Sequence, residues 1–412
     1  MKRQVLHTIN LKNVSRVTVL NYIRHHGKST RANLSNVTGL TFMAIKNILE
    51  ELEDLGLVQQ SDELEGKIGR KAANYIINKD YAYTIGIHIN MFLTRVALMN
   101  LDGEILEAVR IPMNREHMET SQFMDDLCNA VEKVISKSKI PQEKILGIGI
   151  GTPGPIDVEK GTVLNPPNFR LFRYFPLREV LQTRLNLPVL LNKDTNAIAM
   201  GEFWRGAASG TLYESIIYVD ADMGIGSGMI TDGQLQIGAN SAAGEFGHVT
   251  IDFDGPVCNC GSRGCLEAIS SGLSILRQVK EIAPSKRQAL KLEGKHEVDQ
   301  LTDIFAAAAA GDAEIISIIN KAALNMGEAL GSLVNLLDPE LVVLGGMLVY
   351  EYEPFYAIAK DAAENKCLRV SKDIQMARGK LRYKAGVIGA GEIVADTFFS
   401  KTVNDLLSKE KE

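Results

Sequence analysis

The body of the chain repeats one pattern of strands, and this repeat limits the possible folds more than any other feature. Three short apolar runs come first in each copy, and an Asp-Gly turn, at 102–103 or 232–233, joins the second run to the third. Each copy continues into helices and a further apolar run, at 145–149 or 341–344. The repeat predicts two α/β lobes with a cleft between them, and ligands of such sheets bind at the carboxyl ends of the strands. The expected strands are 83–88, 94–99 and 104–111 in the first copy, and 215–219, 226–231 and 234–238 in the second.

Length and hydropathy agree with a multidomain protein. The chain has 412 residues, of which 45% are hydrophobic, so two or three domains with large cores are expected. No apolar run reaches the roughly 18–20 residues that a membrane span needs. The first residues are polar, unlike a signal peptide. We therefore expect a cytoplasmic protein with no membrane partner.

Charge is unevenly distributed along the chain. Residues 1–79 carry 12 Lys and Arg against 7 Asp and Glu, a net +5, whereas the remainder carries 33 against 43, a net −10. A basic head on an acidic body indicates a polyanionic partner for the head alone, although a surplus of this size also arises by chance.

The basic head has the element order of a winged helix-turn-helix. Apolar spacing predicts a first helix over 16–26, a second, capped by Ser29 or Thr30, that runs to about Val37, and a third capped by Thr41. A Thr-Gly turn separates the last two helices, and two strands follow, the first from 57–58 and the second at 75–77.

In this motif the start of the third helix enters the major groove of DNA. Lys and Asn side chains there hydrogen-bond base edges, Phe and Met contact thymine methyl groups, and basic wing residues enter the minor groove. Alternatively, the head is a small helical domain for protein contacts, with Phe42 and Met43 in its core. The candidate DNA contacts are Arg31, Thr41, Phe42, Met43, Lys46 and Asn47, with Arg70 and Lys71 in the wing.

A histidine and three clustered cysteines give the strongest chemical signal. His248 is followed by Cys258, Cys260 and Cys265, with glycines between them that allow a tight backbone. Three thiolates and one imidazole complete a tetrahedral zinc shell, so the metal is expected to be structural. The alternative is three buried free thiols.

Single polar residues near strand ends are weaker signals. Asp194 follows an apolar run and is either a general base acting on a hydroxyl or the cap of the next helix. Glu245 and Glu267 flank the metal motif, which would hold both carboxylates beside the cleft, where they can accept hydrogen bonds from sugar hydroxyls.

Together these motifs resemble the ROK family (repressors, open reading frames, kinases), in its repressor branch, over nearly the whole chain. The segments 244–248 and 258–267 carry the resemblance. The supporting segments are Gly151-Thr152-Pro153-Gly154-Pro155, Asp194-Thr195-Asn196, Gly201-Glu202, Leu344-Gly345-Gly346 and, in the head, Ser15-Arg16 and Thr38-Gly39-Leu40.

The resemblance implies an α/β fold: an N-terminal winged helix-turn-helix followed by a two-lobed, actin-like (ribonuclease-H-type) ATPase fold. The expected domains are the head, 1–79; a first lobe, 80–194, onto which a C-terminal helix, 386–412, packs back; and a second lobe, 195–385, with the zinc site and a dimerisation surface. Asp194 takes the position of the kinase base. The implied ligand-binding residues are Gly154, Asn168, Lys193, Asp194, Glu245, His248 and Glu267.

Departures from the kinase pattern argue against an enzyme. Where the family kinases have Asp-Ile-Gly-Gly-Thr to bind phosphate, this chain has His-Ile-Asn-Met-Phe at 88–92. The bulky side chains obstruct the close backbone approach that phosphate needs. A second turn, usually Gly-Thr-Gly, reads Asp222-Met223-Gly224. Lys193 replaces the usual Asn, so it either pairs with a carboxylate or selects an anionic ligand.

The sequence thus predicts a transcriptional repressor without kinase activity. A sugar or sugar derivative bound between the lobes would control affinity for a palindromic operator in double-stranded DNA, which a homodimer or tetramer reads. The alternatives are an ATP-dependent sugar kinase and a binding scaffold with a vestigial sugar site.

Overall fold

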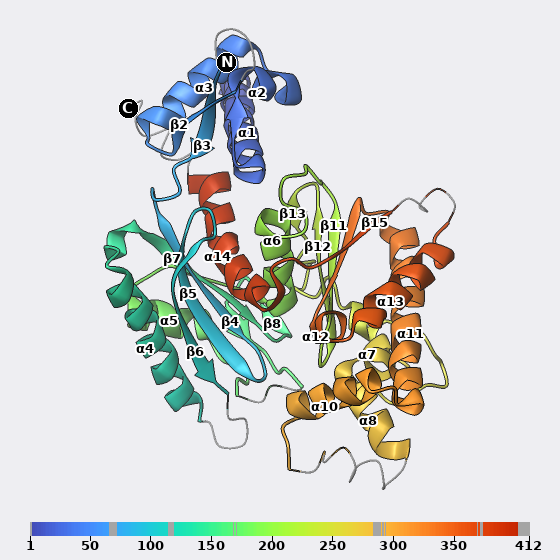
Figure 1. Ribbon diagram of the computed structural model, residues 1–412. Coiled ribbons are helices and arrows are strands. Elements are labelled where there is room, and N and C mark those ends of the chain that lie inside the picture. Colours follow the sequence, from blue (N-terminus) through green and yellow to red (C-terminus); the bar gives the residue numbers. More distant parts are fainter. Residues whose placement is uncertain are drawn as a thin grey trace. The chain divides into compact units, whose positions relative to one another are not determined.

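The computed structural model describes residues 2–65, 72–113, 119–167, 169, 171–282, 290, 292, 294–368, 370 and 374–402. The chain forms two compact units (Figure 1): residues up to Leu212 together with those from Gly386 onward, and residues Tyr213–Ala385. We expected the second lobe to begin at residue 195. The division places 195–212 with the first unit, because helix α6 (Asp194–Arg205) packs on that unit's sheet and on its C-terminal helix.

The head has the expected three helices followed by two strands, and in addition a two-residue strand between the first two helices. Its helices are α1 (Lys2–His26), α2 (Arg31–Thr38) and α3 (Phe42–Asp54), and its strands β1 (Ser29–Thr30), β2 (Val58–Glu65) and β3 (Ala72–Ile77) pair in the order β1-β3-β2. The prediction that the first helix begins at Arg16 was wrong. It begins at Lys2, because no Gly or Pro interrupts the polar residues before the amphipathic stretch.

The predicted caps of the head helices are confirmed. The hydroxyl of Thr30 accepts the backbone N–H of Asn33, and that of Thr41 accepts the N–H of Ala44. Between them, Gly39 adopts a φ of 69°, a left-handed conformation that glycine tolerates best. Val37, expected to point inward, is instead 46% exposed.

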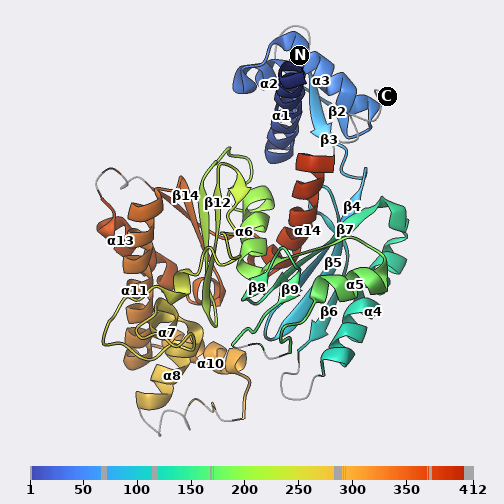
Figure 2. The same cartoon turned by 180° about the vertical axis from the view of Figure 1, so that it is seen from behind.

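The first unit contains a five-stranded sheet in the order β10-β7-β4-β5-β6. The strands are β4 (Tyr83–Ile89), β5 (Leu93–Asn100), β6 (Ile105–Pro112), β7 (Ile145–Thr152) and β10 (Val189–Lys193). Strands β4, β5 and β6 are antiparallel, whereas β7 and β10 continue the sheet in parallel. Helices α4 (Thr120–Ser138) and α5 (Leu177–Leu185) cover one face, while α6 and α14 (Ala385–Thr397) cover the other (Figure 2).

The C-terminal helix packs back onto the first lobe, as expected. A side chain on Gly86 or Gly149 would collide with backbone carbonyls of α14, so the helix lies directly against β4 and β7. A short π-helix, Phe398–Thr402, follows α14, and residues 403–412 of the expected helix lie outside the described residues. Phe398 and Phe399 join the hydrophobic core of the head, so the segment that follows α14 links the head to the lobe.

The second unit repeats the plan of the first. Its sheet order, β13-β12-β11-β14-β15, again joins three antiparallel strands to two parallel ones. The strands are β11 (Ile216–Ala221), β12 (Ile225–Thr231), β13 (Gln234–Leu235), β14 (Leu341–Gly345) and β15 (Gln375–Arg378). The helices are α7 (Leu266–Ser270), α8 (Gly272–Ile282), α10 (Glu297–Ala309), α11 (Ala313–Leu337), α12 (Met347–Glu351) and α13 (Glu353–Lys366).

The strand repeat predicted from the sequence is therefore confirmed, except that the strand expected at 234–238 ends at Leu235. Among the described residues, no helix has both the length and the apolar character to cross a membrane.

Candidate ligand, metal and DNA sites

The carboxyl ends of three parallel strands bring polar residues together in the first unit. Lys193 at the end of β10 is in register with Thr152 at the end of β7, and His88 of β4 pairs with Gly151. All three side chains at this edge are buried, with Lys193 only 4% exposed. The Lys193 side chain runs along Gly154, whereas Asn168 lies outside the described residues.

Asp194 is the first residue of α6. Its Oδ1 accepts the backbone N–H of Thr195 at 2.7 Å, and its side chain stays half-buried. The N-cap position belongs to Lys193, which gives no side-chain cap. A carboxylate at a helix N-terminus is stabilised by the helix dipole.

The turn after β4 satisfies its own backbone donors. Asn90 Oδ1 accepts the N–H of Phe92 and the N–H of Leu93, both at 2.9 Å. In a phosphate-binding turn such donors would face the anion. Sequence reasoning pointed to the bulk of Met91 and Phe92 and missed the role of Asn90, although Asn favours such side-chain-to-backbone turns.

His88, on the strand that leads into this turn, is buried. Its ring lies against Gly386 at the start of α14, where a side chain on the glycine would collide with it. Burial, reinforced by the nearby Arg95 charge, lowers the pKa of His88 to about 4. The imidazole is therefore neutral near neutral pH, and its Nδ1 is buried without a hydrogen-bond partner.

The turn after β11 in the second unit is closed in a similar way. Asp222 Oδ1 accepts the N–H of Met223 at 2.7 Å, and Oδ2 accepts the N–H of Met347 at 3.3 Å. A carboxylate thus occupies donors from two glycine-containing turns, and its negative charge opposes the approach of a phosphate.

The acidic residues predicted to contact a sugar lie beside the metal motif. Glu245 immediately precedes the short 3-10 helix Phe246–His248 and is exposed. Glu267 lies on α7, which packs on that helix, and its Oε2 accepts the N–H of Ile225 at 3.0 Å. Of the predicted ligand residues, the second unit thus holds Glu245, His248 and Glu267, and the first holds Gly154, Lys193 and Asp194.

The four predicted metal ligands converge. The ligand atoms of His248, Cys258, Cys260 and Cys265 all lie within 4.8 Å of one another. Cys260 Sγ is 3.6 Å from Cys265 Sγ, and Cys258 Sγ is 3.7 Å from His248 Nδ1. Zinc–sulfur bonds of about 2.3 Å in a tetrahedron place two sulfurs about 3.8 Å apart, so the arrangement fits a metal of this size.

Metal binding here would require the thiols to lose their protons. Burial and the neighbouring thiols raise the pKa of Cys265 to about 12, so this thiol is protonated near neutral pH in the absence of a cation, and a bound divalent cation would displace the proton. Tight turns shape the loop, because Gly264 has a φ of 68° and a side chain there would strike the carbonyl of Asp252. The donor set is therefore compatible with a structural metal.

The head presents an exposed surface at the start of α3. Phe42 is 56% exposed and Met43 is 62% exposed, so the alternative that placed them in the core was wrong. Thr41 and Asn47 are also exposed, and Lys46 forms a surface pair with Glu50 at 3.6 Å.

The remaining candidates of the head are less accessible or undescribed. The Arg31 guanidinium carbon lies 5.3 Å from the centroid of the Tyr75 ring, and its side chain is half-buried. Arg70 and Lys71 of the predicted wing lie outside the described residues.

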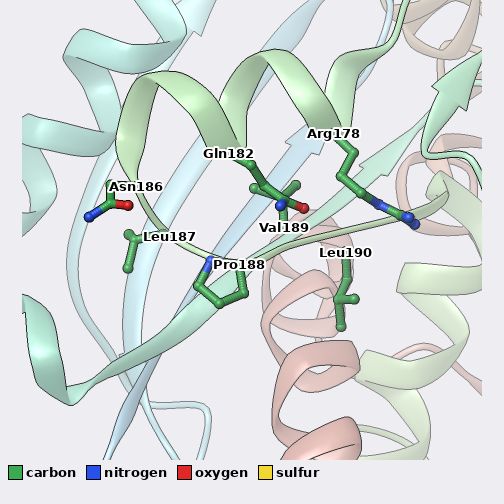
Figure 3. A pocket seen from close by; sticks show the side chains of 7 residues that line it. All are labelled: Arg178, Gln182, Asn186, Leu187, Pro188, Val189 and Leu190. Atoms are coloured by element: carbon green, nitrogen blue, oxygen red, sulfur yellow. The ribbon is translucent and has the colours of Figure 1, made fainter.

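A pocket of about 530 Å³ lies between α5 and the start of β10 (Figure 3). None of its lining residues was predicted to bind a ligand, and Lys193 lies at the other end of the strand. Its lining residues are Arg178, Gln182, Asn186, Leu187, Pro188, Val189 and Leu190.

Comparison with known proteins decides the family. Residues 84–397 match the model of the ROK family. The chain belongs to the ROK family. This ROK protein is 31% identical to a xylose repressor of Caldicellulosiruptor bescii, over 96% of its own length and 98% of the relative. It is 32% identical to a glucokinase of Halalkalibacterium halodurans, over 75% of its length and 94% of that enzyme.

Solved structures agree with the fold. A ROK family transcriptional regulator, a homologue of the E. coli MLC protein, superposes with a TM-score of 0.76 over 97% of this chain and 99% of its own, at 23% identity. A ROK glucokinase from Streptomyces griseus, solved with glucose and AMPPNP, has a TM-score of 0.64 over 76% of this chain and 99% of its own, at 27% identity.

Proposed function

We propose that this ROK protein is a transcriptional repressor that binds operator DNA through its head and responds to a sugar. The observation that carries the proposal is the extent of the matches. The xylose repressor aligns over 96% of the chain, whereas the glucokinase aligns over 75% and the family model begins at residue 84. The match to the xylose repressor thus extends over the head of this chain, whereas the match to the family model leaves the head out.

The head supports DNA binding by its shape and surface. Its helices and three-stranded sheet have the order of a winged helix-turn-helix, and α3 exposes Thr41, Phe42, Met43 and Asn47. An exposed apolar pair beside polar side chains suits a major groove, where thymine methyl groups lie next to hydrogen-bonding base edges. We place Lys46 and Arg31 at the same DNA surface, and Arg70 and Lys71 in its wing.

The proposal excludes phosphotransfer on the chemistry of two turns. Asn90 accepts the backbone donors after β4, and the Asp222 carboxylate accepts those after β11 and β14. An ATP phosphate would have to displace a side chain at the first turn and approach a negative charge at the second. The site that corresponds to the active site of the family kinases would then bind a sugar without transferring phosphate to it.

We propose that the sugar contacts Gly154, Asn168, Lys193 and Asp194 of the first unit and Glu245, His248 and Glu267 of the second. Zinc held by His248 and the three cysteines would stabilise the segment 245–267, which carries the last three residues. Zinc here would be structural, because protein ligands fill all four positions. Operator DNA with two symmetric half-sites would require a homodimer or a tetramer in the cytoplasm.

The test begins with selection of DNA duplexes from a random library by the full-length protein. Fluorescence anisotropy then measures affinity for the selected duplex with and without D-xylose or D-glucose. We expect selection of a palindrome and a sugar-dependent change in affinity of about 5- to 150-fold, the usual range for allosteric coupling. Failure to enrich any sequence would refute the repressor proposal.

The glucokinase relative keeps a sugar kinase as the second candidate. A coupled assay for ADP formation with D-glucose and D-xylose separates the two. We expect no turnover, whereas turnover that Asp194→Asn abolishes would establish the kinase. If neither sugar raises the melting temperature nor changes DNA affinity, and no kinase activity is found, a scaffold with a vestigial site is favoured.

A further inference from the structure

A largely buried cluster of charged and aromatic side chains joins the head to the first lobe, and none of its residues belongs to the proposed DNA or sugar contacts. Its residues come from three helices that are far apart in the sequence: α1 of the head, α6 and the C-terminal helix α14. The cluster, named here the joint, consists of Arg24, His25, Trp204, Arg205, Glu392 and Asp396.

The carboxylate of Glu392 lies between two arginines at the centre of the joint. Arg24 donates Nη2–H to Glu392 Oε2, and Arg205 donates Nε–H to Oε1 at 2.6 Å. Arg24 also donates to Asp396 Oδ1 at 3.2 Å. The Arg24 side chain is fully buried and that of Glu392 is 2% exposed, so solvent barely screens the pair.

Aromatic packing fixes the same helices against each other. The Arg24 guanidinium carbon lies 3.7 Å from the centroid of the Trp204 ring and 4.9 Å from that of Phe399. The ring of His25 packs 4.7 Å from Trp204 and 4.8 Å from Phe203, and both of its nitrogens are buried without a hydrogen-bond partner. His25 thus packs as an aromatic side chain.

A buried network of this kind is weak evidence for stability, but its members are costly to separate. Moving one helix away would leave a charge buried without its partner, which costs more than a surface pair gains. Glu392 contacts both arginines, so α1 and α6 share a single anchor on α14. The head pair Arg16–Glu51, at 2.7 Å, is also largely buried but joins α1 to α3 within the head.

Both α6 and α14 also reach the edge of the sheet that carries the proposed ligand residues. Helix α6 begins at Asp194 and ends at Arg205, a length of 12 residues. At the start of α14, Gly386 packs on His88. If α6 moves at the ligand end, Arg205 at its other end moves with it. If α14 moves, Glu392 moves with it in the same way.

We propose that the joint transmits the ligand state of the lobe to the DNA-binding head. In this proposal, which rests on the proposed function, α6 and α14 carry the displacement and Arg24 passes it to α1. The joint contributes neither to DNA contacts nor to sugar contacts. Its loss should therefore abolish the effect of the sugar on DNA affinity, while the protein still binds both DNA and sugar.

The variant R24M/E392Q removes the central ion pair of the joint, between Arg24 and Glu392, while preserving approximate shape. The matched control R16M/E51Q removes a buried Arg–Glu pair that stays inside the head. Hydrogen exchange followed by mass spectrometry on the full-length proteins needs no ligand. We expect faster exchange, by at least about tenfold, in the last turn of α6 and in residues 388–396 of α14 for R24M/E392Q, and no change there for R16M/E51Q.

Unchanged exchange in α6 with R24M/E392Q would overturn the proposal, whatever the DNA result. Arg24→Lys, which keeps a charge near Glu392, should restore most of the protection and shows whether the variant has merely misfolded.

The second measurement is operator affinity of the selected duplex with and without D-xylose. We expect R24M/E392Q to bind the duplex and to keep the D-xylose-induced rise in melting temperature, but to lose the change in affinity, to less than about twofold. Full retention of that change would refute transmission through the joint. If the wild-type protein itself shows no response, the proposed function fails, and the exchange experiment still tests the joint.

Discussion

The side-chain oxygen of Asn90 lies 2.9 Å from the backbone nitrogen of Phe92 and accepts its hydrogen bond. The same oxygen also takes the N–H of Leu93, so one amide group saturates the turn that follows the first strand of the lobe. The turn is closed by hydrogen bonding, in addition to the bulk of its side chains.

Replacing Asn90 by alanine should therefore destabilise the lobe without creating a nucleotide site. Two half-buried N–H groups lose their acceptor, which predicts a loss of about 1–2 kcal/mol in the free energy of unfolding. Urea denaturation measures the loss, and the exposed Asn47→Ala serves as the control for stability. Isothermal calorimetry should detect no ATP binding to the wild type or the variant, and saturable heat of binding in the wild type would contradict the closed turn.

Metal removal should unfold the loop that carries His248. The ligand atoms already lie within 4.8 Å of one another, so a chelator or the variant C258S/C260S should release one zinc per chain and lower the melting temperature of the second unit. Mass spectrometry under native conditions counts the metal, and calorimetry follows the transition. Cys128→Ala, which removes a buried cysteine of the first unit, should retain the zinc. Full metal content in C258S/C260S would exclude the assigned ligands.

Lys46→Ala should weaken operator binding by about tenfold and leave stability nearly unchanged, because an exposed ion pair contributes little. The chain provides a matched control. Lys360 forms an i,i+4 pair with Glu364 at 3.7 Å, much as Lys46 does with Glu50 at 3.6 Å, but on α13. Lys360→Ala should bind the operator like the wild type. If both variants bind the operator with equal affinity in anisotropy measurements, the proposal that α3 contacts DNA is wrong.

Two buried histidines should make the first unit sensitive to acid. The pKa of His25 is lowered to about 4, by burial first and then by the Arg24 charge, and that of His88 is lowered to about 4 by burial. The unfolded chain binds a proton at each histidine below pH 6.5 while the folded chain does not. The free energy of unfolding should therefore fall between pH 6.5 and 4, by up to about 3 kcal/mol for each group.

The variant H25F/H88Q should show a weaker pH dependence over that interval, measured as the difference in the free energy of unfolding between pH 7 and pH 5. His296→Gln, at a side chain that is 44% exposed, should retain the wild-type slope. A slope that is unchanged in H25F/H88Q would show that other groups control acid unfolding.

Local features of this protein could be predicted from the sequence because nearby residues determine them. Thr30, Gly39 and Thr41 act through hydrogen bonds and dihedral angles within a few residues, and the spacing of three cysteines in eight residues limits where their sulfurs can meet. The repeated runs of apolar residues with matching Asp-Gly turns sufficed to predict two similar sheets. The exposure of Phe42 and Met43 could not be read in this way, since an apolar side chain at a helix start fits either a core or a binding surface.

The tertiary structure alone decided how distant residues meet. Arg24 and Glu392 are 368 positions apart, and no local pattern marks them as partners. Helix α14 brings them together because Gly86 and Gly149 let it lie directly on the sheet, and Phe398 and Phe399 just after it pack into the core of the head. Burial then makes these few charges important, because a charge without its partner in a dry interior is costly, whereas on a surface the same charge would matter little.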